Sequence, residues 1–328
     1  MRRPFAELVA TGRYTPKRVM TNDEFSTRLD TSDQWIRERT GIRERRVAGP
    51  DESNACMGKA AAEQVLQETG LTPLDIDALV VATCSPDRLL PSQACDLQAL
   101  LGAKQAVAFD VQAACTGFLY ALNVAEGLVA SEQATQVLVV ASEKLTSIMD
   151  WTDRATAVLF GDGAGATLVR RSTGGRGILG SYMKSDGALA QLLYRPGGGA
   201  AHPPDAALLT DHSYYIQMAG REVFKAAVLS MADACEKALE RAGLSASDID
   251  LLIPHQANIR IIEATAKHAG LPMDKVYVNV DRYGNTSAAS VAIALDEAVR
   301  GGRLKPGMKV MFCAFGAGLT WASLVVQW

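Results

Sequence analysis

The sequence lacks the features that would assign it to a membrane, metal-binding or exported class. It has no run of about 18 apolar residues, so no membrane-spanning helix is expected. Its six cysteines, at positions 56, 84, 95, 115, 235 and 313, form no Cys-x-x-Cys pair and no spacing suited to zinc, so no metal or cofactor is predicted. Arg2 and Arg3 precede Pro4-Phe5-Ala6-Glu7 instead of the apolar core of a signal peptide, which favours a cytoplasmic location.

An excess of basic residues is also missing. Lys and Arg number 33 against 36 Asp and Glu, a net charge of −3, so a nucleic-acid partner is not expected, although a small local basic patch remains compatible. What the chain does have is 328 residues, 48% of them hydrophobic and 21% charged. This composition is typical of a globular protein, and the length allows about two domain-sized units.

A repeat supports the division into two units. Glu63–Val80 aligns without a gap with Glu236–Ile253, an offset of 173 residues, and eight of the eighteen positions are identical. The identical pairs are Glu63/Glu236, Leu66/Leu239, Gly70/Gly243, Leu71/Leu244, Asp75/Asp248, Ile76/Ile249, Asp77/Asp250 and Leu79/Leu252. The chain is therefore predicted to contain two related halves.

Each copy of the repeat predicts a helix followed by a buried strand. In the first copy, Ser53 is expected to cap a helix ending near Thr69, with Gly70 in the left-handed position after it, and a strand follows at 76–83. In the second copy, a helix ends near Ala242 before Gly243, and a strand follows at 249–253. Alternation of this kind predicts an α/β protein.

Further elements follow each copy. Strands are predicted at 105–111 and 275–280, each leading to a helix, the first of them from about Cys115; the last strands of the two halves are expected at 157–160 and 310–315. Another helix is predicted from near Ala257 to Gly270. The Gly- and Pro-rich segment 195–204 is interpreted as a linker between the halves or a loop beside the substrate.

Cys115 is the strongest candidate nucleophile. It is predicted to lie in the first turn of a helix, where backbone N–H groups and the helix dipole favour the thiolate. The small neighbours Ala113, Ala114 and Gly117 leave room for a ligand. The alternative is a buried packing residue.

His255 and Asn285 are the candidate partners. His255 ends an apolar strand, and α/β proteins place ligands at the carboxyl ends of strands. Asn285 stands in a turn before a helix, where its ordinary role is to cap that helix. Gly161-Asp162-Gly163-Ala164-Gly165 precedes a strand-like segment rather than a helix, so close strand packing is preferred to a phosphate-binding loop.

Motifs along the whole chain resemble those of β-ketoacyl-acyl carrier protein synthase III, the condensing enzyme that starts bacterial fatty-acid synthesis. The segments that carry the resemblance are 30–36 (DTSDQWI), 39–45 (RTGIRER), 113–118 (AACTGF), 160–165 (FGDGAG), 220–225 (GREVFK), 254–258 (PHQAN), 283–287 (YGNTS) and 315–321 (FGAGLTW).

The resemblance implies a thiolase-like fold of duplicated αβαβα layers, dimeric, with an N-terminal half over residues 1–175 and a C-terminal half over residues 176–328. It implies that Cys115, His255 and Asn285 are catalytic. Cys115 would take an acyl group from an acyl-CoA, with the oxyanion held by the N–H groups of Cys115 and Ala317. The neutral donors of His255 and Asn285 would then support decarboxylation of malonyl-acyl carrier protein, with CoA present only as a substrate and no metal required.

Binding residues follow from the same resemblance. Those expected to contact CoA are Trp35, Arg39, Arg154, Gly220, Arg221 and Asn258, where Asn258 would brace His255 or an active-site water. An acidic carrier protein would dock on Lys225, Arg260 and Lys267. Leu90 stands where relatives often have Phe, at the end of an acyl pocket contributed across the dimer, and Ala317 stands where many relatives have Gly.

Other functions stay open at this point. An acyltransferase of secondary metabolism could use the same catalytic set with other acyl donors or with oxygen or nitrogen acceptors. A non-catalytic acyl-CoA or carrier-protein binding module would need none of the three catalytic residues, and a cysteine hydrolase would need no decarboxylation donors. A thiolase would require a second catalytic cysteine, whereas Cys313 is predicted to lie inside a strand.

Overall fold

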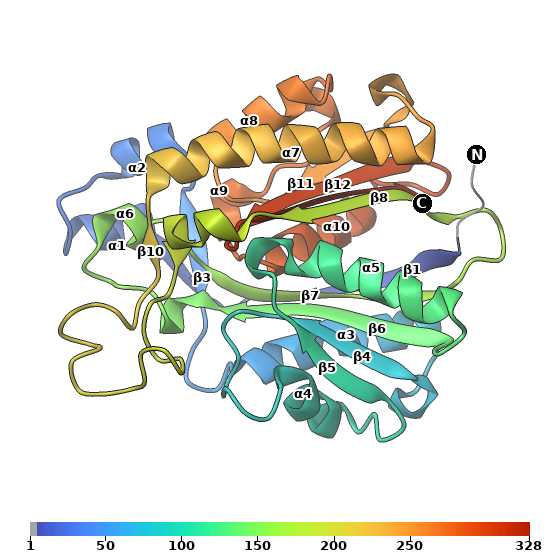
Figure 1. Cartoon of the computed structure of the whole chain (residues 1–328), viewed down its shortest axis with the longest axis horizontal. Helices are drawn as coiled ribbons and strands as arrows, with labels where there is room; N and C mark the ends of the chain where they lie inside the picture. The colour runs from blue at the N-terminus through green and yellow to red at the C-terminus, as the bar shows by residue number, and fades with distance from the viewer. Residues whose placement is uncertain (1–4) are drawn as a thin grey trace.

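The computed structural model describes residues 5–328; Arg2, Arg3 and Pro4 lie outside the described residues. Two sheets organise the chain (Figure 1). The first has the strand order β1 (Ala6–Tyr14), β7 (Asp162–Arg171), β6 (Gln136–Lys144), β4 (Ala78–Ala82) and β5 (Val107–Val111). Strands β6, β4 and β5 are parallel, whereas β7 is antiparallel to both β6 and β1.

The second sheet uses strands that come later in the chain. Its order is β11 (Leu251–Pro254), β12 (Lys309–Gly316), β13 (Thr320–Gln327) and β8 (Gly177–Ser185). Strands β11 and β12 are parallel, and the other two pairs are antiparallel.

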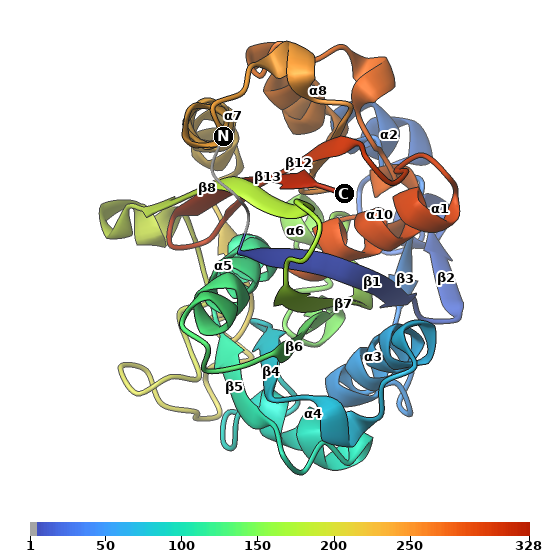
Figure 2. The same cartoon turned by 90° about the vertical axis from the view of Figure 1, so that its right-hand side faces the viewer.

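Helices form layers on both faces of the two sheets. Figure 2 shows α5 (Gly117–Ala130) and α10 (Ala289–Arg300) between the sheets, with α3 (Asn54–Thr69) and α4 (Gln93–Leu101) below and α7 (Gly220–Ala242) and α8 (Ile259–His268) above. Three apolar cores fill the spaces between these layers. The layering confirms the predicted thiolase-like αβαβα architecture.

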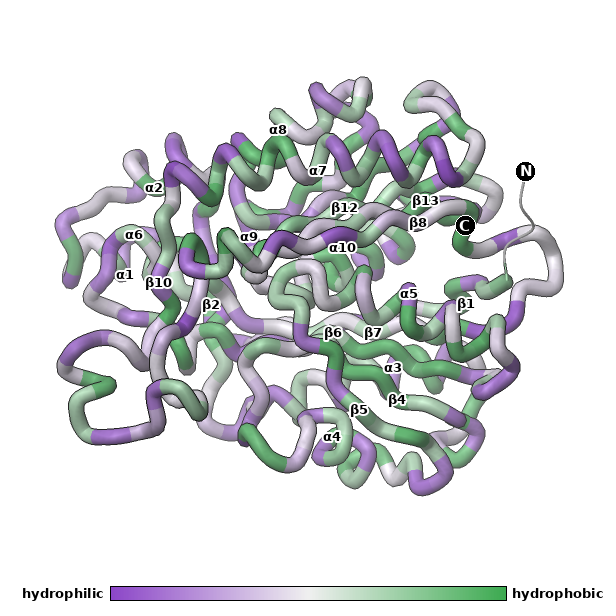
Figure 3. Tube along the Cα trace, in the orientation of Figure 1, coloured by the Kyte–Doolittle hydropathy of each residue, from purple (hydrophilic) through white to green (hydrophobic). Residues whose placement is uncertain are grey.

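Hydropathy follows the layers. Strands β4, β5 and β6 are apolar along most of their length in Figure 3, whereas α7 alternates between apolar and polar residues. Strands β4 and β6 are buried on both faces, so both sets of their side chains avoid water. Helix α7 buries one stripe, which includes Val223, Ala227, Met231 and Ala238, against the second sheet.

The predicted helix ends of the repeat are confirmed. The Ser53 hydroxyl accepts a hydrogen bond from the Cys56 N–H at the start of α3, and Gly70 and Gly243 adopt left-handed conformations with φ of 70° and 66° at the ends of α3 and α7. Helix α8 is capped by Asn258 and begins at Ile259, two residues later than the expected start near Ala257.

Two predicted strands are wrong. Residues 157–160 contribute to a short helix, α6 (Arg154–Ala157), and to a single bridge between Phe160 and Asn285. The side chain of Asp153 caps α6 at the N–H of Ala155, which favours helix over strand there.

The strand expected at 275–280 is reduced to one bridge, between Leu252 and Val276, followed by α9 (Val280–Tyr283). The Gln256 side chain takes the place of a strand partner, because its amide donates to the Tyr277 carbonyl and accepts from the N–H groups of Asn279 and Val280.

Smaller elements complete the fold at one end of the molecule. They are β2 (Arg18–Thr21), α1 (Asn22–Ser26), α2 (Asp33–Thr40), β3 (Glu44–Val47), β9 (Leu193–Tyr194) and β10 (Gln217–Met218). The glycines at 163 and 165 lie in β7, where a Cβ would come within 2.9 Å of Ile293 and 2.5 Å of Ala292. The glycines therefore do allow close packing, but of β7 against the helix α10 and not of strand against strand as predicted.

Candidate active site

Cys115 lies in a 3₁₀ turn, Ala114–Thr116, that leads directly into α5. The residue before it, Ala114, has a φ of 45°, a left-handed conformation that costs energy for a residue with a Cβ. The Cys115 side chain is 6% exposed. The candidate nucleophile therefore lies close to the predicted place, in the turn just before the regular helix and not in its first turn.

Small residues bring the second half of the chain against this turn. A Cβ at Gly316, at the end of β12, would lie 2.7 Å from the backbone nitrogen of Cys115. The hydroxyls of Thr116 and Thr320 are 2.8 Å apart and join the turn to β13. Ala317 directly follows Gly316, so the two N–H groups predicted to hold an oxyanion belong to adjoining segments.

His255 follows β11 and is 3% exposed. Its Nδ1 atom is 2.6 Å from the Ser290 hydroxyl, and burial lowers the pKa of His255 to about 3. The imidazole is therefore neutral near pH 7. It can donate a hydrogen bond in that form, as the sequence analysis expects of it.

Asn285 bridges to Phe160 instead of capping α10. Its backbone N–H donates to the Leu159 carbonyl, and its side-chain oxygen accepts from the N–H of Ser287 at 2.8 Å. Ser287 itself has a φ of 48°. The turn is thus fixed by both halves of the chain.

The segment 285–290 joins the three candidate catalytic residues. It carries Asn285, its Ser290 hydroxyl contacts His255, and its Ser287 hydroxyl is near enough to Cys115 to act on the pKa of that thiol. Ala288, in the same segment, lies against Gly117, where a Cβ would be 3.3 Å from it. Residues from the two halves therefore meet at one place.

The protonation state of Cys115 differs from the sequence-based expectation. Burial, with a smaller contribution from the nearby Glu143 carboxyl, raises the pKa of the Cys115 thiol to about 12, while the Ser287 hydroxyl acts in the opposite direction. A helix start was expected to favour the thiolate. The depth of the site outweighs that effect, so the thiol has to lose its proton as it reacts.

A polar cluster beside Cys115 was not predicted. Glu143, near the end of β6, is fully buried and accepts hydrogen bonds from the Thr83 hydroxyl at 3.1 Å, the Cys84 N–H at 3.1 Å and the Ser85 hydroxyl at 2.5 Å. Burial raises the pKa of the Glu143 carboxyl. Residue spacing does not indicate this cluster, because Glu143 comes near residues 83–85 only through the pairing of the parallel strands β4 and β6.

The predicted CoA-binding residues of α2 and α6 come together. The Trp35 ring has the Arg39 guanidinium 4.7 Å and the Arg154 guanidinium 5.0 Å from its centre. Asn258 donates to the Arg39 carbonyl and accepts from the Arg260 N–H, so Ser290, and not Asn258, braces His255. The alternative role for Asn258, contact with a water, stays a prediction.

The loop after β9 lies on the same side as Arg154. Its His212 ring is 2.6 Å from the Asp150 carboxylate, and the N–H of Ile216 donates to the Ile148 carbonyl. This loop includes the Gly- and Pro-rich segment 195–204 (the olive loops at the lower left of Figure 1). It comes after β8, which is already a strand of the second sheet, so the segment does not link the two sheets.

The predicted docking residues are exposed on the outer helices. Lys225 is on α7, with Gly220 and Arg221 at the exposed start of the same helix, while Arg260 and Lys267 are on α8. The Arg260 guanidinium lies 5.7 Å from the Phe224 ring, which brings α7 and α8 together at this face.

Leu90 lies in the loop between β4 and α4 and is 87% exposed, and its neighbour Leu89 is 74% exposed. This exposure is compatible with a role in the site of a second copy.

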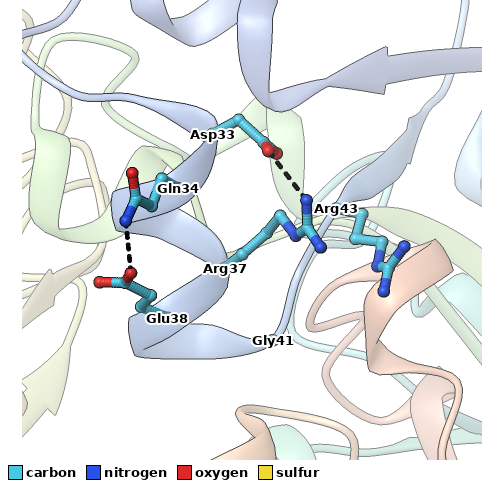
Figure 4. A pocket seen from close by; sticks show the side chains of 6 residues that line it. All are labelled: Asp33, Gln34, Arg37, Glu38, Gly41 and Arg43. Carbon is cyan, nitrogen blue, oxygen red and sulfur yellow. Dashed lines mark hydrogen bonds and ion pairs between the residues drawn. The ribbon is translucent and has the colours of Figure 1, made fainter.

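A surface pocket of about 440 Å³ lies along another face of α2, and Figure 4 shows its side chains. It contains none of the candidate residues. Arg37 pairs with Asp33 and Gln34 with Glu38, so four of its side chains are already partnered (Figure 4). Within residues 5–328, no group of three or more His, Cys, Asp and Glu side chains is arranged to hold a metal ion.

Comparison with known proteins gives the same family for both parts of the site. Residues 109–187, which include Cys115, match the family model described as 3-oxoacyl-[acyl-carrier-protein (ACP)] synthase III, and residues 239–328, which include His255 and Asn285, match the model of its C-terminal part. A β-ketoacyl-[acyl-carrier-protein] synthase III from Caldanaerobacter subterraneus subsp. tengcongensis is 50% identical over 98% of both chains. The chain belongs to the 3-oxoacyl-[acyl-carrier-protein] synthase III family.

Solved structures of synthase III proteins have the same fold. The crystal structure of 3-oxoacyl-[acyl-carrier-protein] synthase III from Aquifex aeolicus is 44% identical, with a TM-score of 0.92 over 98% of this chain and all of that one. The priming β-ketosynthase of the R1128 polyketide pathway is 38% identical, with a TM-score of 0.90 over 99% of this chain and 96% of that one. The synthase III chain described here is therefore an acyltransferase of the condensing type, an enzyme of fatty-acid biosynthesis with a thiolase-like fold.

Cys313 agrees with a synthase III and not with a thiolase. It lies inside β12, fully buried on the face that packs against α7, where it contacts Cys235. It is thus on the opposite face of the sheet from the layer that contains α5 and α10.

Proposed function

We propose that this synthase III condenses an acyl-CoA primer with malonyl-acyl carrier protein, giving 3-oxoacyl-acyl carrier protein, CoA and CO₂, and so starts fatty-acid synthesis. The observation that carries the proposal is the meeting of Cys115 with the 285–290 segment, which also holds Asn285 and contacts His255. A binding module would need no buried thiol at this place, and a hydrolase would need no neutral donors beside it.

In the first half-reaction, Cys115 attacks the thioester carbon of the acyl-CoA, and the CoA thiolate leaves. The N–H groups of Cys115 and Ala317 hold the negative charge that develops on the carbonyl oxygen. Such donors act before the charge appears and require no reorganisation. The close approach of Gly316 to Cys115 supports this pairing.

In the second half-reaction, malonyl-acyl carrier protein loses CO₂, and its thioester carbonyl becomes an enolate. His255 and Asn285 donate hydrogen bonds to that enolate oxygen. A neutral imidazole suits this role, and burial keeps His255 neutral. The enolate carbon then attacks the acyl group on Cys115 and releases the 3-oxoacyl product.

Exposed basic side chains are proposed to bind the two negatively charged substrates, CoA and the acidic carrier protein. The adenine and phosphates of CoA bind Trp35, Arg39 and Arg154, with Gly220, Arg221 and Asn258 nearby. Two guanidinium groups over one indole ring form a surface suited to a flat base with attached phosphates. The acidic carrier protein docks on Lys225, Arg260 and Lys267, which are exposed on adjoining helices.

A second copy completes the site. Strand β5 is at the edge of the first sheet, and its Val107 is 65% exposed. Leu89 and Leu90 are also mostly exposed, at 74% and 87%. Folded proteins usually cover such an edge and such an apolar surface. Pairing of two chains there would bring Leu90 to the acyl pocket of the partner, where a residue smaller than Phe admits longer or branched primers.

Two organisational features belong to the same proposal. The halves divide at residues 175 and 176, between β7 and β8, and the enzyme works in the cytoplasm. No helix among residues 5–328 is long and apolar enough to cross a membrane.

The similarity to a polyketide priming synthase favours one second candidate, an acyltransferase of secondary metabolism with another acyl donor. Intact-protein mass spectrometry after incubation with a panel of acyl-CoAs, followed by malonyl-acyl carrier protein, separates the two. Short or branched adducts on Cys115 that disappear as a 3-oxoacyl carrier product forms support the fatty-acid starter. Adducts only from long or aromatic donors, or adducts that ignore the malonyl carrier, support the second candidate.

A further inference from the structure

Arg45, on β3, is a charged side chain that is completely buried. Burial lowers the pKa of its guanidinium to about 10, so the group keeps its charge at pH 7. In the part of the chain that the structure describes, no carboxylate forms an ion pair with it, and the nearby Glu24 and Glu44 pair with other arginines. A buried charge is costly unless hydrogen bonds replace its water, so the partners of Arg45 indicate its role.

Hydrogen bonds from Arg45 join two parts of the chain that are far apart in the sequence. Its Nη1 atom donates to the side-chain oxygen of Asn22 at 2.8 Å and to the Met20 carbonyl at 3.3 Å. Its Nη2 atom donates to the Val158 carbonyl at 2.7 Å. The guanidinium carbon lies over the Phe25 ring, 4.7 Å from the ring centre. Because a guanidinium is planar and rigid, these contacts fix residue 158 relative to β2 and α1.

The segment after Val158 is the one that holds Asn285. The Asn285 N–H donates to the Leu159 carbonyl at 2.8 Å, and the Gly161 N–H donates to the Asn285 carbonyl at 3.0 Å. The Val158 carbonyl, which Arg45 binds, directly precedes the Leu159 carbonyl in the chain. The guanidinium therefore anchors the segment to which both backbone groups of Asn285 are bound.

The stem of Arg45 lies close to both sides of this bridge. A Cβ at Gly161 would be 3.0 Å from the Arg45 Cβ, and a Cβ at Gly284 would be 3.4 Å from it. Gly284 directly precedes Asn285 and has a φ of 64°, a conformation that glycine adopts readily. One buried side chain is thus next to the turn of Asn285 and next to the segment that binds this turn.

The orientation of the Asn285 amide decides which of its atoms can meet a substrate. Its oxygen accepts from the Ser287 N–H, so the amide nitrogen is the atom that can donate to an enolate oxygen. We propose that Arg45 is a positioning residue for Asn285: by fixing the 158–161 segment, it keeps this nitrogen where the enolate oxygen forms. The inference rests on the proposed function, which gives Asn285 that role in decarboxylation.

The contacts of Arg45 predict which half-reaction it affects. The Cys115 turn lies against Gly316 in another part of the molecule, so acylation is expected to be independent of Arg45. At the other end of the network, Asn22 donates to the Asp33 carboxylate at the start of α2, the helix with proposed CoA contacts. If Arg45 only supported α2, its loss would weaken CoA binding and leave decarboxylation normal.

The test compares the two half-reactions in the full-length protein with Arg45→Met, which removes the charge and its hydrogen bonds. Intact mass gives the fraction of Cys115 that acetyl-CoA acylates. Release of CO₂ from malonyl-acyl carrier protein is divided by that fraction, so unfolded molecules do not count. Acylation at saturating acetyl-CoA is expected to be unchanged. The kcat of decarboxylation is expected to fall about 10- to 100-fold, with an unchanged KM for the carrier, because the amide is displaced and not removed.

Two further variants test whether the guanidinium itself is needed. Arg45→Lys keeps the charge but lacks the planar fork, so it should lose less activity than Arg45→Met. Arg43→Met is the matched control, because it removes the same charge from an exposed residue that borders the pocket of Figure 4, and it should leave both half-reactions unchanged. If neither Arg45 variant takes an acyl group, the inference is wrong, because it requires acylation to be spared.

A double variant separates positioning from general damage. Arg45→Met combined with Asn285→Ala is expected to decarboxylate no more slowly than Asn285→Ala alone, because Arg45 acts only through that amide. Losses that multiply would overturn the inference, as would a raised KM for acetyl-CoA in Arg45→Met with normal decarboxylation. Normal decarboxylation by Arg45→Met beside a slow Asn285→Ala would overturn this inference alone. If Asn285→Ala itself decarboxylated normally, the proposed role of Asn285 would be wrong, and this inference with it.

Discussion

The two copies of the repeat form the same scaffold and differ in what they present beyond it. Asp77 and Asp250 occupy equivalent positions and make equivalent bonds. The Asp77 N–H donates to the Gln136 carbonyl and its carboxylate accepts the Gln136 N–H, while Asp250 makes both bonds with Lys309. This identity therefore preserves how each copy joins its neighbouring strand, which is a structural role and not a catalytic one.

The equivalence extends to the start of the two central helices. Ala114 and Ser287 are 173 residues apart, the same offset as the repeat, and both have a left-handed backbone, with φ of 45° and 48°. In the first half this turn places Cys115, and in the second it places Ser287 beside that cysteine. Duplication supplied one strained turn twice, and the two copies now face each other with different side chains.

The largest expected effect is on the first half alone. Cys115→Ala should abolish covalent acylation, because no other thiol or hydroxyl is proposed to attack the thioester. Intact mass after incubation with acyl-CoA checks this, with the melting temperature as the control for folding. An adduct of unchanged yield in the variant would place the nucleophile elsewhere.

A smaller and selective effect is expected from the second half. His255→Ala and Asn285→Ala should largely spare acylation and reduce decarboxylation by about 100- to 1,000-fold, since each removes one donor to the enolate. Release of CO₂ from malonyl-acyl carrier protein is the measurement. If both variants condensed normally, the division of roles between the halves would be wrong.

Burial of His255 should also affect stability. Its native pKa of about 3 is below the usual 6.5, so the unfolded chain binds more protons between these values and stability falls as pH drops below 6.5. At pH 5 the loss from this group is about 2 kcal/mol. Urea unfolding at pH 7.5 and pH 5 should show a loss smaller by this amount in His255→Asn, and an identical loss in both proteins would refute the assignment.

The smallest expected effect compares the two aspartates. Asp77→Asn should cost about 1–2 kcal/mol and Asp250→Asn about 1 kcal/mol, because the Asp77 carboxylate accepts from the N–H groups of both Thr135 and Gln136, whereas Asp250 accepts from Lys309 alone. Urea unfolding of both variants at one pH gives the comparison. A larger loss for Asp250→Asn than for Asp77→Asn would contradict this count of hydrogen bonds.

Much of the scaffold could be predicted because its signals are local. Ser53, Gly70 and Gly243 mark helix ends through their own backbone preferences, and the structure confirms them. The strand expected at 275–280 was wrong because the Gln256 side chain satisfies its backbone groups, and no periodicity in the segment itself reveals a distant glutamine.

The site could be predicted in its parts and not in its electrostatics. Cys115, His255 and Asn285 stand out by residue type and position. The raised pKa of Cys115 depends on how deeply two sheets bury it, and Glu143 reaches the site only because β4 and β6 end side by side. Neither the depth of burial of Cys115 nor the pairing of β4 with β6 can be predicted from the spacing of residues.

The contact of Gly316 with Cys115 has a consequence for how activity should be interpreted. Strand β12 of the later part of the chain lies directly on the turn that carries Cys115, the candidate nucleophile, and the Thr116–Thr320 hydroxyl pair closes the same junction. Neither sheet holds a complete site when it folds alone. Acyl transfer therefore reports the docking of the two sheets on each other, and in a partly unfolded population it should disappear as soon as that junction opens, even while each sheet keeps its secondary structure.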